Sequence, residues 1–137
     1  MEYLIGTALG VFVLILARVT RFDTDRSFYP VILIVIAFYY VLFAVMIEEA
    51  DVIFYELLAS VVFSSVAIIS GMRNLVYVVA AGLILHGVYD LTHNLIFINP
   101  GTPSWWQGFC AAFDFVLGVD CLYLNANYNR SMSMPID

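Results

Sequence analysis

The stretch FYPVILIVIAFYYVLFAVMI, residues 28–47, decides the fold, because it runs for twenty residues without a charged side chain. A transmembrane helix needs about 20 consecutive, mostly apolar residues to cross the hydrocarbon core of a bilayer. The stretch meets that length. We therefore predict a membrane-spanning helix over residues 28–47.

Four further apolar stretches, on both sides of this one, come close to the same length or reach it. They cover residues 3–17, 52–70, 75–98 and 106–124. The segments between them are short and carry charged or turn-forming residues, such as Asn-Pro-Gly at 99–101. We predict an all-α polytopic membrane protein, in which residues 1–137 form a single domain, a bundle of five transmembrane helices.

The composition supports this class of protein. Of the 137 residues, 64% are hydrophobic and 12% are charged, whereas soluble domains average roughly 45–50% apolar and 25% charged residues. The net charge is −6, and no basic patch is present that could hold nucleic acid. We expect the lipid bilayer to be the main partner and exclude nucleic acid.

The arginines predict the orientation of the bundle. With five spans, every arginine falls on the same side, and the set is Arg18, Arg21, Arg26, Arg73 and Arg130. Cytoplasmic loops collect positive charge, so this side faces the cytoplasm. The N-terminus lacks the basic region of a cleaved signal, so we expect the first span to be retained. The prediction is a multi-pass protein of the cell (inner) membrane, with its N-terminus outside and its C-terminus cytoplasmic.

Ionisable residues inside the predicted spans are the main functional signal, because such residues are rare at membrane depth and usually face a bundle interior. They are Glu56 on the third span, His86, Asp90 and His93 on the fourth, and Asp114 and Asp120 on the fifth. At 100° per residue, Asp90 and His93 lie about 40° and 20° either side of His86, so these three share one face. Asp114 and Asp120 lie roughly 120° apart and cannot both face the same neighbour.

Counting 1.5 Å per residue from the outer surface places several of these groups at similar depth. Glu56 lies roughly 7 Å down, His93 about 9 Å, Asp114 about 12 Å and Asp90 about 13 Å. His86 lies deeper, near ~20 Å. Three spans therefore bring carboxylates and an imidazole to one level, and we predict a polar site in the outer half of the membrane.

The residue types at this level suit a divalent transition metal. Asp90-x-x-His93 places a carboxylate and an imidazole on adjacent turns, as Glu-x-x-His does in helical-bundle metal sites. Zn, Fe and Mn all accept imidazole and carboxylate ligands. We predict Asp90 and His93 as ligands, with Glu56 and Asp114 as further ligands or as a catalytic base, and His86 in second rank. The leading hypothesis is a metal-dependent enzyme that acts on a lipid-soluble small molecule.

Two other functions fit the same residues. In the first, the histidines only pair with carboxylates to hold helices together, as interhelical hydrogen bonds can do, and the chain is a non-catalytic accessory or structural subunit of a membrane complex. In the second, the acids and histidines form a proton or ion path. Residues 75–85, however, contain no acid, base or histidine on the inner half of the fourth span.

Small residues suggest where helices approach one another. Gly6-x-x-x-Gly10 on the first span is a close-approach pattern that serves either dimerisation or internal packing. A homo-oligomer or a membrane partner could therefore bind through this helix. Cys110 and Cys121 lie about 16 Å apart along one helix, too far for a disulfide. We interpret them as packing residues, with a soft metal ligand as the alternative.

Three segments near the C-terminus carry a family resemblance. Residues 86–94 (HGVYDLTHN), 103–106 (PSWW) and 109–114 (FCAAFD) together resemble a family of small uncharacterised bacterial integral membrane proteins. The resemblance covers the last two spans. It implies a fold of four to five helices and nothing about chemistry. Membrane desaturases and alkaline ceramidase-like hydrolases need more histidines than the two found here.

Overall fold

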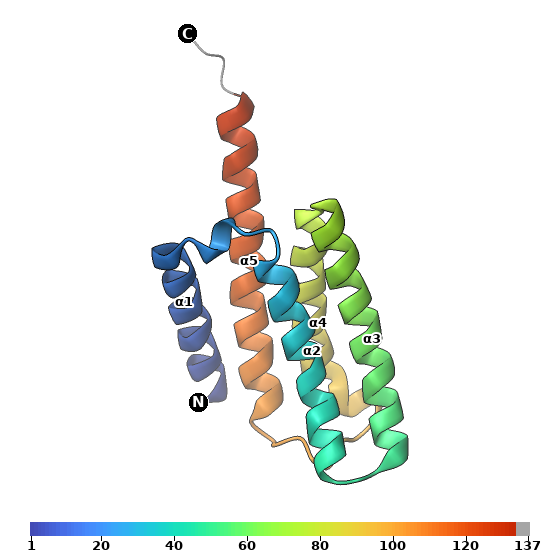
Figure 1. Cartoon of the computed structure of the whole chain (residues 1–137). Coiled ribbons are helices and arrows are strands. Elements are labelled where there is room, and N and C mark those ends of the chain that lie inside the picture. The colour runs from blue at the N-terminus through green and yellow to red at the C-terminus, as the bar shows by residue number, and fades with distance from the viewer. Residues whose placement is uncertain (134–137) are drawn as a thin grey trace.

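The computed structural model describes residues 1–133, with side chains through residue 125. Within this part of the chain every long element is a helix (Figure 1). The elements are α1 (Glu2–Thr20), the 3₁₀ turn η1 (Phe22–Thr24), α2 (Phe28–Met46), α3 (Ala50–Arg73), α4 (Val76–Ile96) and α5 (Trp106–Ser133). All five α-helices are long and apolar enough to span a membrane. The predicted all-α, five-helix architecture is confirmed.

The helix ends differ from the predicted ones because hydropathy detects the apolar part of a helix and misses its polar ends. Helix α1 extends to Thr20 instead of residue 17, and α3 covers 50–73 instead of 52–70. Helix α4 is shorter than predicted and ends at Ile96. Both α1 and α3 end at a residue in the left-handed conformation, Arg21 and Asn74 respectively, which is a common way to stop a helix.

Successive helices run in opposite directions, so the two ends of the bundle differ in chemistry (Figure 1). One end, here the arginine end, carries Arg18, Arg21, Arg26 and Arg73. The Arg130 side chain lies outside the described residues. In the loop at this end, the Asp25 carboxylate accepts the backbone N–H of Ser27 at 2.8 Å, and this hydrogen bond lowers the pKa of Asp25.

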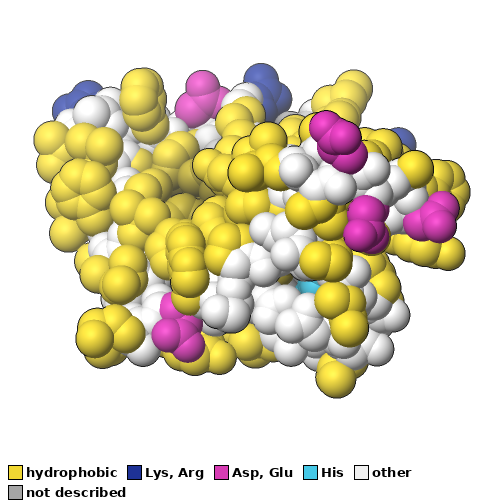
Figure 2. All heavy atoms as spheres, turned by 90° about the horizontal axis from the view of Figure 1, so that it is seen from below, with side chains coloured by type: hydrophobic (Ala, Val, Ile, Leu, Met, Phe, Trp, Pro, Cys, Tyr) yellow, Lys and Arg dark blue, Asp and Glu magenta, His cyan; other side chains and the backbone are white. Residues whose placement is uncertain are grey.

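The opposite end, which we call the tryptophan end, carries the N-terminus, the α2–α3 turn and the α4–α5 loop (Figure 1). Trp105 lies in this loop, and Trp106 begins α5. Figure 2 looks onto this end and shows acidic side chains at several places among apolar ones. A histidine side chain is just visible between the surrounding atoms. The alternation of the helices thus separates arginines from tryptophans as predicted, whereas the orientation in a membrane stays a prediction.

Helices α4 and α5 form the centre of the bundle, with α3 packed on α4 and α2 packed on α3. Fully buried leucines from three helices fill the core, namely Leu33, Leu83 and Leu117. Many large apolar side chains face outward around the bundle, including Phe12, Val35 and Phe54. An apolar perimeter of this extent suits hydrocarbon, because soluble proteins rarely expose large contiguous apolar patches.

Helix α1 lies at the edge of the bundle and packs on α5 without contacting α2. Its two glycines face α5: a Cβ at Gly6 would overlap the Phe109 carbonyl oxygen, and one at Gly10 would lie 3.1 Å from the Val116 side chain. The Gly-x-x-x-Gly pattern therefore serves internal packing. Binding of a partner through the other faces of α1 remains a prediction.

Candidate functional site

Two buried polar clusters lie along α4, and each joins it to a different neighbour. The His86 cluster, which links α4 to α5, consists of His86, Asp90, Cys110 and Asp114. The Glu56 cluster, which links α4 to α3 and to the α4–α5 loop, consists of Glu56, Tyr89, His93 and Asn99.

The His86 cluster arises from two pairs of residues with the same spacing. His86 and Asp90 are four residues apart on α4, and Cys110 and Asp114 are four residues apart on α5. Residues at this spacing lie on one helix face. Gly87 lets the helices approach closely, since a Cβ there would lie 3.2 Å from the carbonyl oxygen of residue 111. Two adjacent helices thus present two potential ligands each to the same space.

The four side chains of this cluster are in close contact. The Nδ1 atom of His86 lies 2.7 Å from Asp114 Oδ2 and 3.5 Å from Asp90 Oδ2. One ligating atom from each of the four residues lies within 4.8 Å of all the others. All four residues are at most 2% exposed, so they are buried from bulk solvent.

Several polar atoms of the His86 cluster have no hydrogen-bond partner among the described residues. These atoms are His86 Nε2, Asp90 Oδ2 and Asp114 Oδ1. Buried polar atoms nearly always have a partner, because leaving one unsatisfied costs about 1–3 kcal/mol. Three such atoms in one place could be satisfied by a bound ion or another polar ligand.

The charges of the His86 cluster also suit a bound cation. The cluster contains two carboxyl groups and one imidazole, so if both carboxyl groups are ionised, even a protonated His86 leaves one negative charge in excess. Among the described arginines, Arg18 forms ion pairs, and its partners are Asp23 and Asp120 at the arginine end. None of the described arginines therefore compensates Asp90 or Asp114, although an uncompensated charge in a low-dielectric interior is strongly unfavourable.

The Glu56 cluster is better satisfied. Glu56 Oε1 lies 2.9 Å from His93 Nε2 and accepts the Asn99 side-chain N–H at 2.7 Å, and Oε2 accepts the Tyr89 hydroxyl at 3.2 Å. Both carboxylate oxygens are thus engaged, and one acid faces one imidazole. The Nδ1 atom of His93 has no partner among the described residues.

Tyr40 on α2 connects the two clusters. Its hydroxyl donates to Asp90 Oδ1 at 2.8 Å, and its ring stacks on His93 with centroids 4.3 Å apart and planes 13° apart. Its backbone carbonyl accepts the Asn99 side-chain N–H at 3.1 Å. Tyr40 therefore fixes the orientation of Asp90 and of His93 at once.

All five residues predicted for the site are buried in the bundle, but the structure divides them between the two clusters. Asp90, Asp114 and His86 form one cluster, and Glu56 and His93 form the other. The greater depth predicted for His86 is wrong relative to Asp114, which it contacts. Since α4 ends at Ile96 and α5 begins at Trp106, His86 lies about 15 Å and Asp114 about 12 Å from these helix ends. The ligand and base roles assigned to these residues stay predictions.

Sequence reasoning gave Cys110 only as an alternative, soft ligand, and it did not single out Tyr89 or Asn99. The four-residue spacing that His86 and Asp90 share with Cys110 and Asp114 was a signal that could have identified Cys110. Tyr89 and Asn99 come from separate segments, and no local pattern marks them.

Asp120 belongs to neither cluster. It accepts a hydrogen bond from Arg18 on α1 and another from the Tyr29 hydroxyl on α2 at 2.8 Å. The predicted divergence of Asp114 and Asp120 is therefore confirmed. This contact joins three helices at the arginine end.

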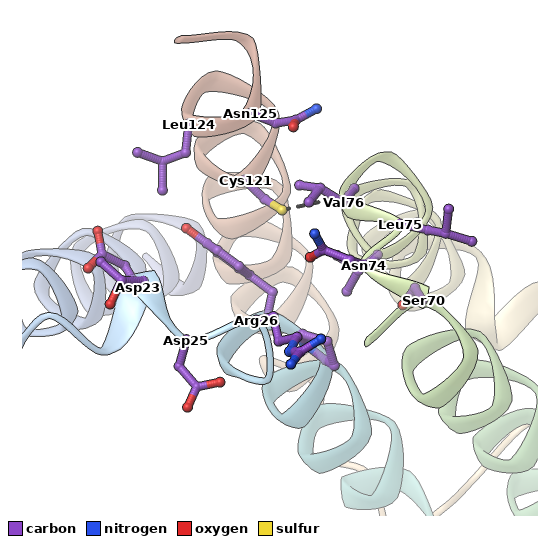
Figure 3. Close-up of a pocket in the computed structure, with 14 residues that line it drawn as sticks. Asp23, Asp25, Arg26, Ser70, Asn74, Leu75, Val76, Cys121, Leu124 and Asn125 are labelled. Carbon is purple, nitrogen blue, oxygen red and sulfur yellow. Dashed lines mark hydrogen bonds between the residues drawn. The ribbon is translucent and has the colours of Figure 1, made fainter. Parts of the chain in front are cut away.

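A pocket of about 470 Å³ lies beside this contact at the arginine end (Figure 3). Its walls mix charges, with Asp23, Asp25 and Arg26 on one side and Asn74 and Cys121 on the other. The Cys121 thiol lies 3.8 Å from the backbone carbonyl of residue 76. Cys121 and Cys110 are both free, as the sequence predicts. The two polar clusters do not line this pocket.

The donor set of the His86 cluster matches the known ligands of transition metals. Imidazole nitrogen, carboxylate oxygen and thiol sulfur are the three ligand types that bind Zn²⁺ in proteins, at about 2.0–2.3 Å. Ligands around such an ion lie at most about 4.6 Å apart, close to the 4.8 Å limit within this cluster. A thiol ligand favours Zn or Fe over Mn.

Fold and site together define a helical protein with five candidate membrane spans and a buried group of residues that could hold a metal ion. The chain belongs to a family of unknown function, DUF6010, whose profile matches residues 1–127. The match covers all five candidate spans. No curated protein and no solved structure matches the chain.

Proposed function

We propose that this chain is a membrane metalloprotein that binds one divalent transition metal ion in the His86 cluster. The observation that carries the proposal is the pair of buried carboxylates that face one imidazole and retain unpartnered oxygens. A divalent cation with ionised Asp90 and Asp114, a neutral His86 and a Cys110 that keeps its proton gives a net charge of zero, which suits a membrane interior. As a direct ligand Cys110 would be a thiolate, and the site would then carry one negative charge. The set of ligands favours Zn or Fe, with Mn less suited to the thiol.

The proposed activity is a metal-dependent reaction on a lipid-soluble substrate. A bound metal would supply a Lewis acid in a site that excludes water. The chain itself supplies a second acid–base group nearby, the Glu56–His93 pair, which is connected to Asp90 through Tyr40. In this proposal Glu56 acts as the base. Asp114, the other predicted base, serves as a ligand because it contacts His86 directly.

Elemental analysis tests the proposed metal site. The protein purified in detergent without chelators is expected to contain one transition metal ion per chain. His86→Ala and Asp114→Asn should lose it, because each removes a ligand. His93→Ala is the matched control: it removes an equally buried histidine of the same helix from the other cluster, and it should keep the metal.

Circular dichroism of each variant shows whether it remains folded. A folded wild-type protein that stays free of metal after incubation with Zn²⁺ or Fe²⁺ would contradict the proposal. Loss of metal from His93→Ala but not from His86→Ala would move the site to the Glu56 cluster.

A non-catalytic role in a membrane complex is the second candidate, and the hydrogen bonds between helices favour it. His86 joins α4 to α5, and His93 joins α4 to α3. In that case one carboxyl of the His86 cluster holds a proton in place of the metal, and the same elemental analysis gives no metal in a stable bundle. Proton translocation fits less well, because residues 75–85 of α4 offer no acid, base or histidine between the clusters and the arginine end.

A further inference from the structure

An apolar groove of about 430 Å³ runs along the outside of the bundle between α1 and α2. Its floor is α5, and it exists because α1 packs on α5 without reaching α2. The residues that line it are Leu9, Val13, Val31, Ile32, Val35, Ile36, Tyr39, Trp106, Phe109, Cys110 and Phe113. Ligand pockets in proteins typically measure about 300–1,000 Å³, so the groove is large enough for a small molecule or a chain segment.

The groove meets the His86 cluster at Cys110. This residue lines the groove, and its thiol is one of the four candidate metal ligands. An occupant of the groove therefore lies against the wall of the proposed metal site. The pocket at the arginine end shares no residue with either cluster. The groove is therefore the better route to the proposed metal site.

The position of the groove determines the chemistry of its occupant. It opens sideways through exposed apolar residues, such as Val31 and Val35, on helices long enough to span a bilayer. It extends about 10 Å along α5, from residue 106 to residue 113, and about 12 Å along α2, from residue 31 to residue 39, so it lies within a hydrocarbon core of ~30 Å. The surroundings at that depth are acyl chains, and the walls of the groove offer almost no polar surface.

The polar head group of an occupant fits best at the tryptophan end of the groove. There the rings of Tyr39 and Trp106 lie 4.9 Å apart, and the indole N–H of Trp106 has no partner among the described residues. A second pocket shares Trp106 and Phe109 with the groove and continues past Glu2 to the surface. Trp and Tyr are typical of the level at which lipid head groups lie.

We propose that the groove binds the hydrocarbon chain of a single membrane lipid, with its polar head at the tryptophan end, and presents that lipid to the His86 cluster. This inference rests on the proposed function and names its substrate class: a long-chain lipid that enters from the bilayer. The lipid reaches the site laterally, without passing through water.

Photolabelling tests the proposal. The full-length protein is reconstituted in phospholipid nanodiscs with a small fraction of palmitic acid that carries a diazirine on its chain. After illumination, the labelled peptides are identified by mass spectrometry. Label is expected to concentrate on the groove walls, above the level on other lipid-facing residues, and excess unlabelled palmitic acid should reduce it.

A pair of matched variants on α2 makes the test specific. Val31→Trp fills the groove from a position that is 52% exposed and should lower the groove labelling severalfold. Val45→Trp adds the same side chain at a position that is 50% exposed and outside the groove, and it should leave the labelling unchanged. Both positions face outward, so neither substitution disturbs the core.

Metal content measured on the same samples separates the two proposals. Groove labelling that Val31→Trp abolishes, in a protein without metal, supports the groove and overturns the metal site. Bound metal with labelling spread evenly over all lipid-facing helices overturns the groove and leaves the metal site. Crosslinks between two protein chains across the groove would show that a second copy occupies it, and would also overturn the lipid proposal.

Discussion

At the scale of single residues, Tyr40 is the side chain that connects the two polar clusters. It donates a hydrogen bond to Asp90, stacks on His93 and is 1% exposed. From the sequence it is one of two adjacent tyrosines, Tyr39 and Tyr40, in an apolar stretch. Helical periodicity does not decide which of the two faces the interior, because both faces of this helix are apolar. The burial of the acids and histidines was predictable, whereas their partners were not.

Tyr40→Phe should weaken metal binding. The variant keeps the ring that stacks on His93 and removes the hydroxyl that orients Asp90. Loss of such an outer-shell hydrogen bond typically costs about 10–100-fold in metal affinity. Competition with a chromophoric chelator measures the change. Tyr39→Phe is the control, because its ring packs near Trp106 outside the clusters, and equal affinities for both variants would contradict the assigned role.

At the scale of helices, hydropathy found all five elements, but the contacts between helices needed the structure. The first helix could use its glycines inside the chain or toward another molecule, and nothing in the local sequence distinguishes these uses. The structure shows that Gly6 and Gly10 face α5. In the same way, the segment 99–101 is recognisable as a turn, but only the fold places the Asn99 side chain on Glu56.

Gly6→Val should therefore destabilise the packing of α1 on α5. The new side chain would overlap the Phe109 carbonyl, and overpacking of this kind typically costs about 1–3 kcal/mol. The expected result is a lower temperature of thermal unfolding in detergent. Ala8→Val, which changes an exposed position of the same helix, controls for the β-branched side chain. An unchanged unfolding temperature for Gly6→Val would argue against this contact.

At the scale of the whole molecule, the number of helices and the clustering of arginines at one end agree with the sequence. The orientation in the membrane follows from the positive-inside rule alone. Single cysteines introduced at exposed positions test it, namely Glu49→Cys at the tryptophan end and Arg26→Cys at the arginine end. The native cysteines are buried and should react little.

A membrane-impermeant maleimide applied to intact cells should label Glu49→Cys and not Arg26→Cys. After lysis, both variants should be labelled. The reverse pattern on intact cells would invert the predicted topology. It would leave the two clusters and the groove unaffected, because these depend on contacts inside the chain.

The part of α4 without acids, bases or histidines, residues 75–85, separates the His86 cluster from the arginine end. This apolar stretch disfavours the passage of ions and protons along α4, since they cross hydrocarbon only at high cost. Charged species would therefore reach and leave the proposed site from one side of the membrane. In the proposed function, a charged species would arrive from, and return to, the compartment that faces the tryptophans, and the composition of that compartment would decide which ion the protein binds.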